Sequence, residues 1–560
     1  MRVVVFTSDP KLEETPWWSV LLGTPGLEAV LVCRKKRLRN PTAIWRSVRR
    51  NVAKHGLIFV PYRVGKLIVD SVRHLLTRPA PRPPVPAHMR FEEVQTFDPH
   101  GPEVLERVRA WRPDLGVSLG ANILKPALFG IPARGTINLH QGKVPEFRGA
   151  PPGFWELMTG ARTIGVMVHW VDAGLDTGPV LGRAEAPIYQ HDTLQAVQAR
   201  AAELACRVLG DVLHRLARGD TDATPQPPGG RTFRFPTLRQ RAALAWRLRT
   251  RGLARTLAPR QLVKLASYLA MFCLFRPLRD LWRGVTGRHP VRVFTFHRIS
   301  HLCRDGMTIS PHDFRRQIAY VRRHHEVVTI ERAMELIANR ARLRRPVAVL
   351  TFDDAYRSVY DIARPLLADL GLPACCFVSS EVVGPGREFA HDASNPIRRY
   401  LEVMTWSQLR ELRGSGWSIG GHGQHHRRLS DCDGHALEEE IVAPLATLRA
   451  RLGIERPPLA YPFGQPDDLS PAARTLAQQS GYRACFSNFG GENFPGDDLF
   501  RLKRMEIGGD HPTVGWMCRV HGIDLRRWRG VWDGRGLTVR AAARPRPAVD
   551  SRRGAAAGAR

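Results

Sequence analysis

Two stretches of the chain alternate short apolar runs with amphipathic helical patterns. The first, between residues 2 and 171, contains the runs RVVVF, LEAVLVC, LGVSLG, TINLH and IGVMVHWV. The second, between residues 291 and 488, contains VRVFTFH, VAVLTFDD, PACCFV, WSIGGH, PLAYPFG and RACFSN. Short apolar runs separated by helices are typical of parallel sheets covered on both faces. The pattern predicts two α/β domains, and 560 residues are enough for a core in each.

Two basic segments interrupt this order. Residues 34–90 contain Asp70 as their only acid, and residues 237–290 contain Asp280 as theirs. Both mix Trp, Leu and Val with Arg at helical spacing, as helices lying on a membrane surface do. Helices packed on the two domains with a solvated basic face are the alternative, and the sequence leaves both interpretations open.

These patterns divide the chain into four parts. We expect an α/β domain over 1–235 with a basic helical insertion at about 34–90, a basic helical connector over 236–290, a second α/β domain over 291–525, and a disordered basic tail over 526–560.

The charge and the cysteines indicate in which cellular compartment the protein is expected. The net charge is +32 at pH 7, which favours an anionic partner or an anionic membrane face, although an arginine-rich coding bias explains it equally well. The nine cysteines form no CxxC pair, and Cys375 and Cys376 belong to an apparent buried strand, so we expect reduced thiols. MRVVVFTS begins as a strand, and LVKLASYLAMFCLF is short for a bilayer span. We expect a cytoplasmic protein, with peripheral contact at the inner face of the membrane left open.

A first candidate site lies in the strand TINLH. Asn138 and His140 are two residues apart, so their side chains share one face of that strand. Formyl transfer to an amine passes through an oxyanion, which needs a donor, and requires a group that accepts the amine proton. An amide and an imidazole provide both, and Asp176, in the turn GLDTGPV, can orient the imidazole.

The text from SLGANI through LDTGPVL, about residues 115–185, resembles the folate-dependent formyltransferase family, which includes methionyl-tRNA, glycinamide-ribonucleotide and sugar-nucleotide enzymes. The resemblance implies an N-terminal Rossmann-like formyltransferase fold, with 10-formyltetrahydrofolate bound near SLGANI. It implies a catalytic trio of Asn138, His140 and Asp176. The family's LPxxRG is VPEFRG here, with a departure at Val144 and with Arg148 as a candidate substrate contact.

A second candidate site combines carboxylates and imidazoles that follow two predicted strands. Asp353 and Asp354 end VAVLTFDD, while His422 and His426 follow WSIGG. Catalytic groups of α/β folds gather at such strand ends. One Asp oxygen and two imidazoles form a three-ligand metal set with a position left for water, and the other Asp can accept a proton from that water. Hydrolysis of an amide is the natural use of this set.

The motifs FTFHRI, TFDD, MTWSQLRELRGSGWSIGGH, HxxxHxxL and AYPFG resemble the polysaccharide deacetylase (NodB-like) family across about 291–512. The resemblance implies a C-terminal NodB-type deformed (β/α) barrel with Asp353 as base. It implies a divalent metal, zinc by default, on Asp354, His422 and His426. The backbone N–H of Phe463 is the implied oxyanion donor, and Arg504 is the candidate partner of the base.

Two features depart from the deacetylase pattern. Gly423 follows the first histidine where Ser or Thr is frequent, and no late LxIxLH segment supplies a general-acid histidine, so the general acid stays unassigned. His425 is interpreted as a neighbour of the metal site, not a ligand.

Three functions follow from these sites. The first is a multifunctional enzyme in which a transferase domain formylates a sugar amine and a hydrolase domain removes an N-formyl or N-acetyl group, with an amino sugar, a sugar nucleotide or a lipid-linked sugar as substrate. The second keeps the deacetylase alone active, beside an idle formyltransferase-like domain that binds substrate. The third is a tRNA-binding formyltransferase, which is disfavoured because no small β-barrel pattern follows residue 230.

Overall fold

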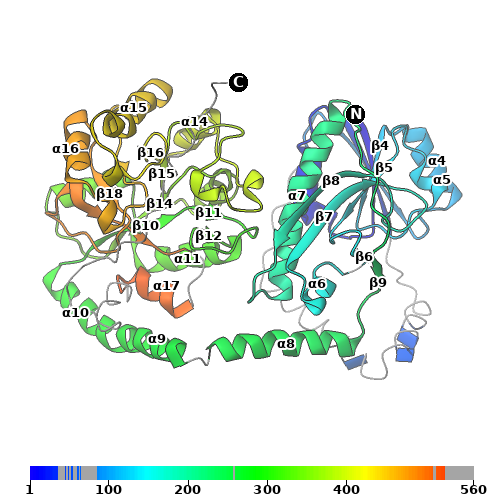
Figure 1. The fold of residues 1–560 in the computed structure, drawn as a ribbon, viewed down its shortest axis with the longest axis horizontal. Helices are drawn as coiled ribbons and strands as arrows, with labels where there is room; N and C mark the ends of the chain where they lie inside the picture. The colour runs from blue at the N-terminus through cyan, green and yellow to red at the C-terminus, as the bar shows by residue number, and fades with distance from the viewer. Residues whose placement is uncertain are drawn as a thin grey trace, which may run out of the picture.

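The computed structural model describes residues 1–35, 85–149, 151–256, 259–508 and 513–523, with short pieces between 45 and 64. Two α/β bodies lie side by side, and a helical connector runs beneath both (Figure 1). Most of the predicted insertion at 34–90 and all of the predicted tail at 526–560 lie outside the described residues.

The N-terminal body is built on a seven-stranded sheet with the order β3-β2-β1-β4-β5-β7-β8. Pairing is parallel from β3 to β5 and antiparallel for β7 and β8. The strands are β1 (Arg2–Thr7), β2 (Ala29–Lys35), β3 (Arg90–Thr96), β4 (Leu115–Leu119), β5 (Thr136–His140), β7 (Thr163–Trp170) and β8 (Val180–Pro187). A separate pair joins β6 (Phe147–Gly149) to β9 (Arg231–Phe233).

Helices cover both faces of this sheet. They are α1 (Pro16–Leu22), α4 (Pro102–Trp111), α5 (Pro126–Phe129), α6 (Phe154–Thr159) and α7 (Leu194–Ala217). Thr193 caps α7 by accepting a hydrogen bond from Ala196 N. Buried side chains of α7 recur every three or four residues and pack against β7, β8 and α1.

The C-terminal body contains a parallel sheet that curls into a nearly closed barrel. Its order is β19-β18-β17-β16-β15-β14-β10-β20, and β13 also pairs with β14. The strands are β10 (Val291–Phe296), β13 (Glu326–Val327), β14 (Val347–Phe352), β15 (Cys375–Val378), β16 (Ser418–Gly421), β17 (Leu459–Ala460), β18 (Cys485–Ser487), β19 (Leu502–Lys503) and β20 (Met505–Glu506). Only Arg504 separates β19 from β20, which lie at opposite ends of the strand order, so the barrel closes across that residue.

Helices surround the barrel: α11 (Pro311–His324), α12 (Ile330–Ala338), the π-turn η3 (Val359–Ala363), α13 (Arg364–Asp369), α14 (Trp406–Gly414), α15 (Gly434–Leu452), α16 (Pro471–Ser480) and α17 (Thr513–Val520). Leu437, Ile441, Leu445, Leu448 and Leu452 recur at helical spacing and are buried on one side of α15. The two α/β domains predicted from the sequence are thus confirmed. All nine cysteines are free, with Cys375 and Cys376 buried in β15.

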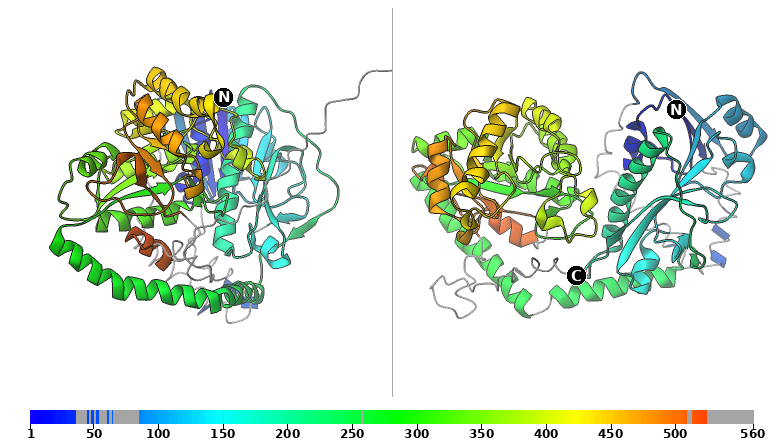
Figure 2. Two further views of the ribbon diagram at one scale, coloured as in Figure 1. Left: turned by 60° about the vertical axis from the view of Figure 1, so that its left-hand side comes forward. Right: turned by 45° about the horizontal axis from the view of Figure 1, so that its top comes forward.

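The connector consists of α8 (Leu238–Thr256), α9 (Pro259–Ala270), the short π-helix η2 (Met271–Phe275) and α10 (Arg276–Thr286). It passes below both bodies and reaches β10 (Figures 1 and 2). Across the described part of the chain, we find no helix that combines the length and the apolarity needed to cross a bilayer.

Helix α7 also contacts the second body, next to the short pair β11 (Arg298–Ile299) and β12 (Thr308–Ile309). Arg200 forms a buried ion pair with Asp192, and its Nε donates to the carbonyl of His301 at 3.0 Å. Glu203 accepts from Ser300 Oγ at 2.7 Å and from His301 N at 2.6 Å. Side chains of the first body therefore form hydrogen bonds with backbone groups of the second.

Loss of the Arg200 guanidinium should destabilise the protein. Arg200→Met leaves the Asp192 carboxylate, which is fully buried, without its bidentate partner. Removing one member of a buried pair costs about 3–5 kcal/mol. We expect a clearly lower thermal midpoint by calorimetry. Arg316→Met, which breaks a half-exposed pair with Asp313, is the control and should cost about 1 kcal/mol or less. Equal shifts for both variants would contradict the role of the pair.

Candidate functional sites

The first site gathers at the carboxyl end of β5. Asn138 Nδ2 lies 3.2 Å from Asp176 Oδ1, and His140 Nδ1 lies 3.3 Å from Asp176 Oδ2. Asp176 reaches them from the turn between β7 and β8, where its φ is +55°. The structure thus brings the three residues of the predicted trio together.

The electrostatics of this site favour a neutral imidazole beside a charged carboxylate. Burial lowers the pKa of His140, outweighing the opposing effect of Asp176. Burial alone would raise the pKa of Asp176, but the neighbouring imidazoles of His169 and His140 bring it below its usual value. Near pH 7 His140 can therefore accept a proton, and Asp176 can stabilise the imidazolium that forms.

His169 is a member of this site that sequence reasoning missed. It pairs with Asn138 across β5 and β7, and its Nε2 lies 3.2 Å from Asn138 Nδ2. Its Nδ1 lies 2.8 Å from the carbonyl of Trp170, so Nδ1–H donates there and Nε2 accepts from the amide. The only signal in the sequence was a histidine inside the apolar run VMVHWV.

A cavity of about 460 Å³ opens beside these groups. Residues 118–124, which include the SLGANI segment, line it together with Asn138, His140 and Asp176. Arg148, the predicted substrate contact, is not among the residues that line this cavity, although its charge helps to lower the pKa of His140. Its guanidinium donates to the carbonyl of Gly229 at 2.9 Å and to Gln226, because β6 pairs with β9.

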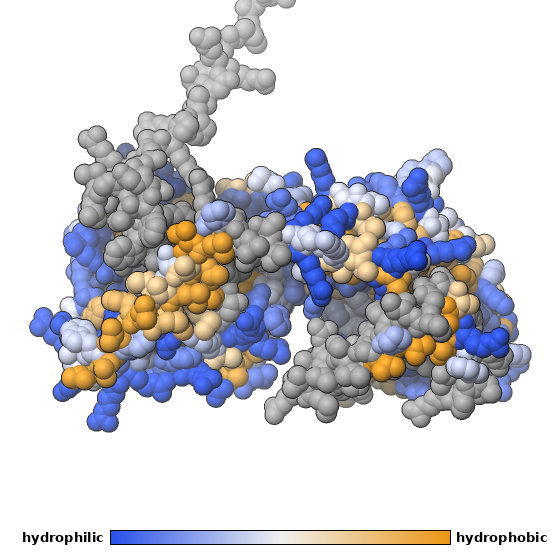
Figure 3. All heavy atoms as spheres, turned by 90° about the horizontal axis from the view of Figure 1, so that it is seen from below, coloured by the Kyte–Doolittle hydropathy of each residue, from blue (hydrophilic) through white to orange (hydrophobic). Residues whose placement is uncertain are grey.

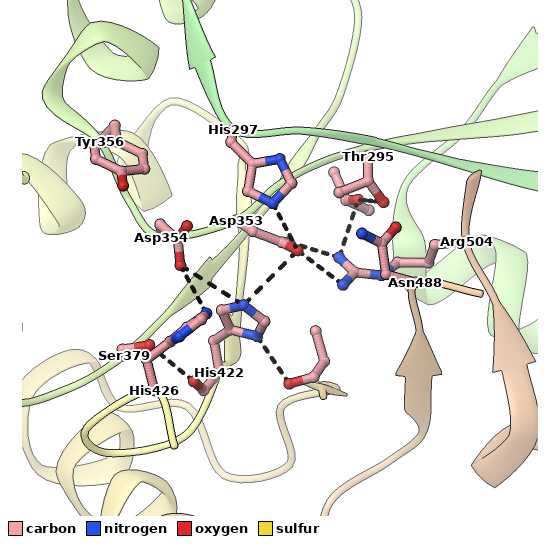
Figure 4. A network of polar contacts seen from close by, with 12 residues as sticks. Thr295, His297, Asp353, Asp354, Tyr356, Ser379, His422, His426, Asn488 and Arg504 are labelled. Atoms are coloured by element: carbon pink, nitrogen blue, oxygen red, sulfur yellow. Dashed lines mark hydrogen bonds and ion pairs between the residues drawn. The ribbon is translucent and has the colours of Figure 1, made fainter. Parts of the chain in front are cut away.

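The second site lies where β14 and β16 end (Figure 4). Asp353 and Asp354 follow β14, and Asp354 has a φ of +68°, which turns the chain sharply. His422 and His426 follow β16 and bring their Nε2 atoms to 3.7 and 3.4 Å from Asp354 Oδ1. The ligand atoms of Asp354, His422 and His426 all lie within 4.8 Å of one another.

This group fits a divalent cation. Both carboxylate oxygens of Asp354 are buried without a hydrogen-bond partner, which is costly unless a cation binds them. Ligand atoms at ordinary zinc distances stand about 3.3 Å apart around a tetrahedral ion, close to the spacing seen here. His422 Nδ1 donates to the carbonyl of Ala460 at 2.9 Å, which leaves Nε2 free to bind metal.

The pKa values agree with this assignment. Burial lowers the pKa of His422 to about 3 and that of His426 to about 4, so both imidazoles are neutral. Burial raises the pKa of Asp354 to about 7, and a bound cation would reverse that shift because it stabilises the carboxylate.

Asp353 is held as a carboxylate by Arg504. The guanidinium makes two contacts with it, Nη1 to Oδ1 at 2.6 Å and Nη2 to Oδ2 at 2.8 Å (Figure 4). Burial alone would raise the pKa of Asp353, but the charge of Arg504 brings it down to about 2. His422 Nε2 lies 3.8 Å from Oδ2, so Asp353 borders the group formed by Asp354, His422 and His426.

Glu440 of α15 is a second residue that sequence reasoning missed. Its buried carboxylate accepts from the backbone N–H groups of Gln424, His425 and Arg427 at 3.0–3.3 Å. A Cβ on Gly423 would lie 2.6 Å from Glu440 Oε2. The carboxylate thus takes the room that Ser or Thr would need at position 423.

Two further imidazoles face the carboxylates. His297 Nε2 lies 3.9 Å from Asp353 Oδ2, and His391 Nε2 lies 3.9 Å from Asp354 Oδ2 and 2.9 Å from Tyr356 Oη. The motif FTFHRI contains His297, but the sequence pattern did not assign a function to that residue. The ring of Phe463 packs edge-on against His426 at the exposed side of the site.

Removal of the Asp354 carboxylate should abolish metal binding. Asp354→Asn keeps the shape of the side chain but loses the charge on which the cation depends. After zinc reconstitution and desalting, we expect about one metal per chain in the wild type and less than about a tenth of that in the variant, by mass spectrometry. His425→Gln is the matched control, since His425 contacts Glu439 instead. Metal retained in Asp354→Asn would refute the ligand assignment.

Comparison with known families gives two matches. A formyl transferase family model matches residues 70–213, and a polysaccharide deacetylase family model matches residues 340–485. The methionyl-tRNA formyltransferase of Trichlorobacter lovleyi is 32% identical over 207 residues, which are 37% of this chain and 60% of that relative. The chain thus spans less than two thirds of this relative's length.

Solved structures similar to this chain come from both classes. IcaB from Ammonifex degensii is 24% identical, with a TM-score of 0.35 over 41% of this chain and 96% of its own. The formyltransferase PseJ from Anoxybacillus kamchatkensis, solved with UDP-4,6-dideoxy-4-formamido-L-AltNAc and tetrahydrofolate, is 26% identical, with a TM-score of 0.24 over 28% of this chain and 79% of its own. On its family matches and its fold, the chain joins an N-terminal formyl transferase domain to a C-terminal NodB-like polysaccharide deacetylase domain.

Proposed function

We propose that the protein is a bifunctional carbohydrate-modifying enzyme that formylates a sugar amine at one site and hydrolyses an N-acyl group at the other. The observation that carries the hydrolase assignment is the buried set of Asp354, His422 and His426 beside the charged Asp353. The trio around Asp176 supports the transferase assignment.

In the proposed hydrolysis, water attacks the acyl carbon of an N-acylated amino sugar. Asp354, His422 and His426 would hold a divalent cation, with zinc as the ordinary choice for this donor set, and the cation would supply Lewis acidity to the acyl carbonyl and to the attacking water. Asp353 accepts the proton of that water, and Arg504 keeps Asp353 ionised and oriented for the task. The backbone N–H of Phe463 is the proposed oxyanion donor. The C–N bond then breaks, the departing nitrogen takes up the proton that Asp353 accepted, and the products are a carboxylate, formate or acetate, and the free amine.

In the proposed formyl transfer, a sugar amine attacks the formyl carbon of 10-formyltetrahydrofolate, which would occupy the cavity lined by residues 118–124. His140 accepts the amine proton, and Asp176 stabilises the charge that results. Asn138 donates to the oxyanion by giving up one of its two acceptors, Asp176 or His169. The bond between the formyl carbon and N10 of the folate then breaks, N10 takes up the proton from His140, and the products are the N-formyl sugar and tetrahydrofolate.

The two activities are compatible on one class of substrate. A formyl group removes the charge and nucleophilicity of an amine, and later hydrolysis restores both, so the reactions can act at different stages around an intervening step. An amino sugar, a sugar nucleotide or a lipid-linked sugar meets this requirement. Peripheral contact with the inner face of an anionic membrane would suit the last of these.

The role of Arg504 predicts a change in pH dependence. Arg504→Gln removes the charge that depresses the pKa of Asp353, so burial should raise that pKa and the base should protonate at higher pH. With saturating metal, we expect the acid limb of kcat/KM for acyl release to move upward by at least about one pH unit. Arg504→Lys keeps the charge and should show a smaller shift. An unchanged limb in the Gln variant would argue against Asp353 as the base.

The transferase proposal predicts a loss that is confined to one activity. Asn138→Ala removes the oxyanion donor and should lower formyl transfer from 10-formyltetrahydrofolate to amino-sugar nucleotides by about 10²–10³-fold, while acyl release stays unchanged. Asp353→Asn should show the reverse pattern. A wild-type protein that formylates no sugar would support an idle substrate-binding domain. Formylation of methionyl-tRNA alone would favour the tRNA function suggested by the relative from Trichlorobacter lovleyi.

A further inference from the structure

Helix α10 turns its basic side chains towards the protein. Arg279 donates to the carbonyl of His521 at 2.7 Å, and Arg283 is buried in an ion pair with Glu492. Arg292 of β10 shares the Glu492 carboxylate. The polar face of this amphipathic helix is therefore its packed face, the reverse of an ordinary surface helix.

The apolar side chains of α10 point outward as a result. Leu278, Leu281 and Val285 are 71%, 67% and 75% exposed, and Trp282 is also exposed. Leucines in such numbers on one helix face are unusual on the surface of a monomeric protein. Figure 3, which views the molecule from the side of the connector, shows apolar residues gathered in a band across one half of this face.

The band continues along the connector towards α9. Its members, named here the connector stripe, are exposed and recur at helical spacing: Leu262, Leu269, Leu274, Leu278, Leu281 and Val285. The opposite side of α9 packs against α17, with Tyr268 buried beside Cys518 and Ile523, while Arg279 and Arg283 hold α10 against the domain. The connector stripe is thus fixed on the domain surface and faces away from it.

The connector that carries this stripe is mostly positively charged. Residues 237–290 contain eleven arginines and one lysine against the single acid Asp280, which contacts Arg276 and Arg279. Exposed cations follow the connector at Arg249, Arg251 and Arg288. An apolar face bordered by cations matches the interface of a bilayer with anionic head groups.

We propose that the connector stripe seats the protein on an anionic lipid bilayer, with α9 and α10 lying in the plane of the interface. A second copy of the chain is the less suitable occupant, because face-to-face docking would bring two basic connectors together without acids to neutralise them. Trp282, beside the leucines, is the residue type enriched at the level of the head groups. This inference does not depend on either enzymatic activity.

The test is sedimentation of the full-length protein with vesicles of phosphatidylcholine containing about 30% phosphatidylglycerol. We expect retention at about 0.05 M salt, weaker retention at about 0.5 M salt, and little retention on pure phosphatidylcholine. The double variant Leu278→Gln/Leu281→Gln should lower retention by about tenfold or more, since it removes apolar groups that would enter the interface.

Val442→Gln/Leu469→Gln is the matched control, because it removes two exposed apolar side chains from the same domain outside the connector. It should retain wild-type binding, and both double variants should keep the wild-type thermal midpoint. Equal retention of all three proteins would overturn the proposal. A different result would also overturn it: the wild type does not bind vesicles but forms a dimer in sedimentation velocity, and the Leu278→Gln/Leu281→Gln variant is a monomer.

Discussion

The ion pair between Arg504 and Asp353 connects the closure of the barrel to the chemistry of the second site. Arg504 lies between β19 and β20, the strands at the two edges of the sheet. Its guanidinium donates two hydrogen bonds to the carboxylate of Asp353, which follows β14. Both groups are almost fully buried, so neither could be left alone without a large desolvation penalty. The last strands of the barrel are thus held against Asp353, and Asp353 stays ionised because Arg504 contacts it where the two ends of the sheet meet.

Sequence patterns predicted the sheets and the groups at the strand ends, since strand composition and the residues just after a strand are local features. Asp354, His422 and His426 could be predicted in this way. Contacts between segments that are distant in the sequence could not be predicted. Glu440 reaches the loop after His422 from α15, and the Arg148 guanidinium binds Gly229, about eighty residues later, because β6 pairs with β9. Neither contact leaves a signal in the local pattern.

The orientation of the connector could not be predicted from the sequence either. Its mixture of leucine, tryptophan and arginine predicts an amphipathic helix, but the pattern does not say which face meets the protein. The acceptors that decide this are Glu492 and the carbonyl of His521, both more than 200 residues away. Because these acceptors draw the arginines inward, the leucines have no protein surface to cover.

The contact between α7 and the loop after β11 affects how the halves can be studied. Glu203 belongs to the transferase half, yet it satisfies a backbone N–H and a hydroxyl of the deacetylase half. Dividing the chain within the connector would therefore leave each fragment with polar groups that water must rehydrate, although each keeps its own sheet. The two bodies are thus joined by direct polar contacts as well as by the connector, and removal of either body would leave these groups of the other without their partners.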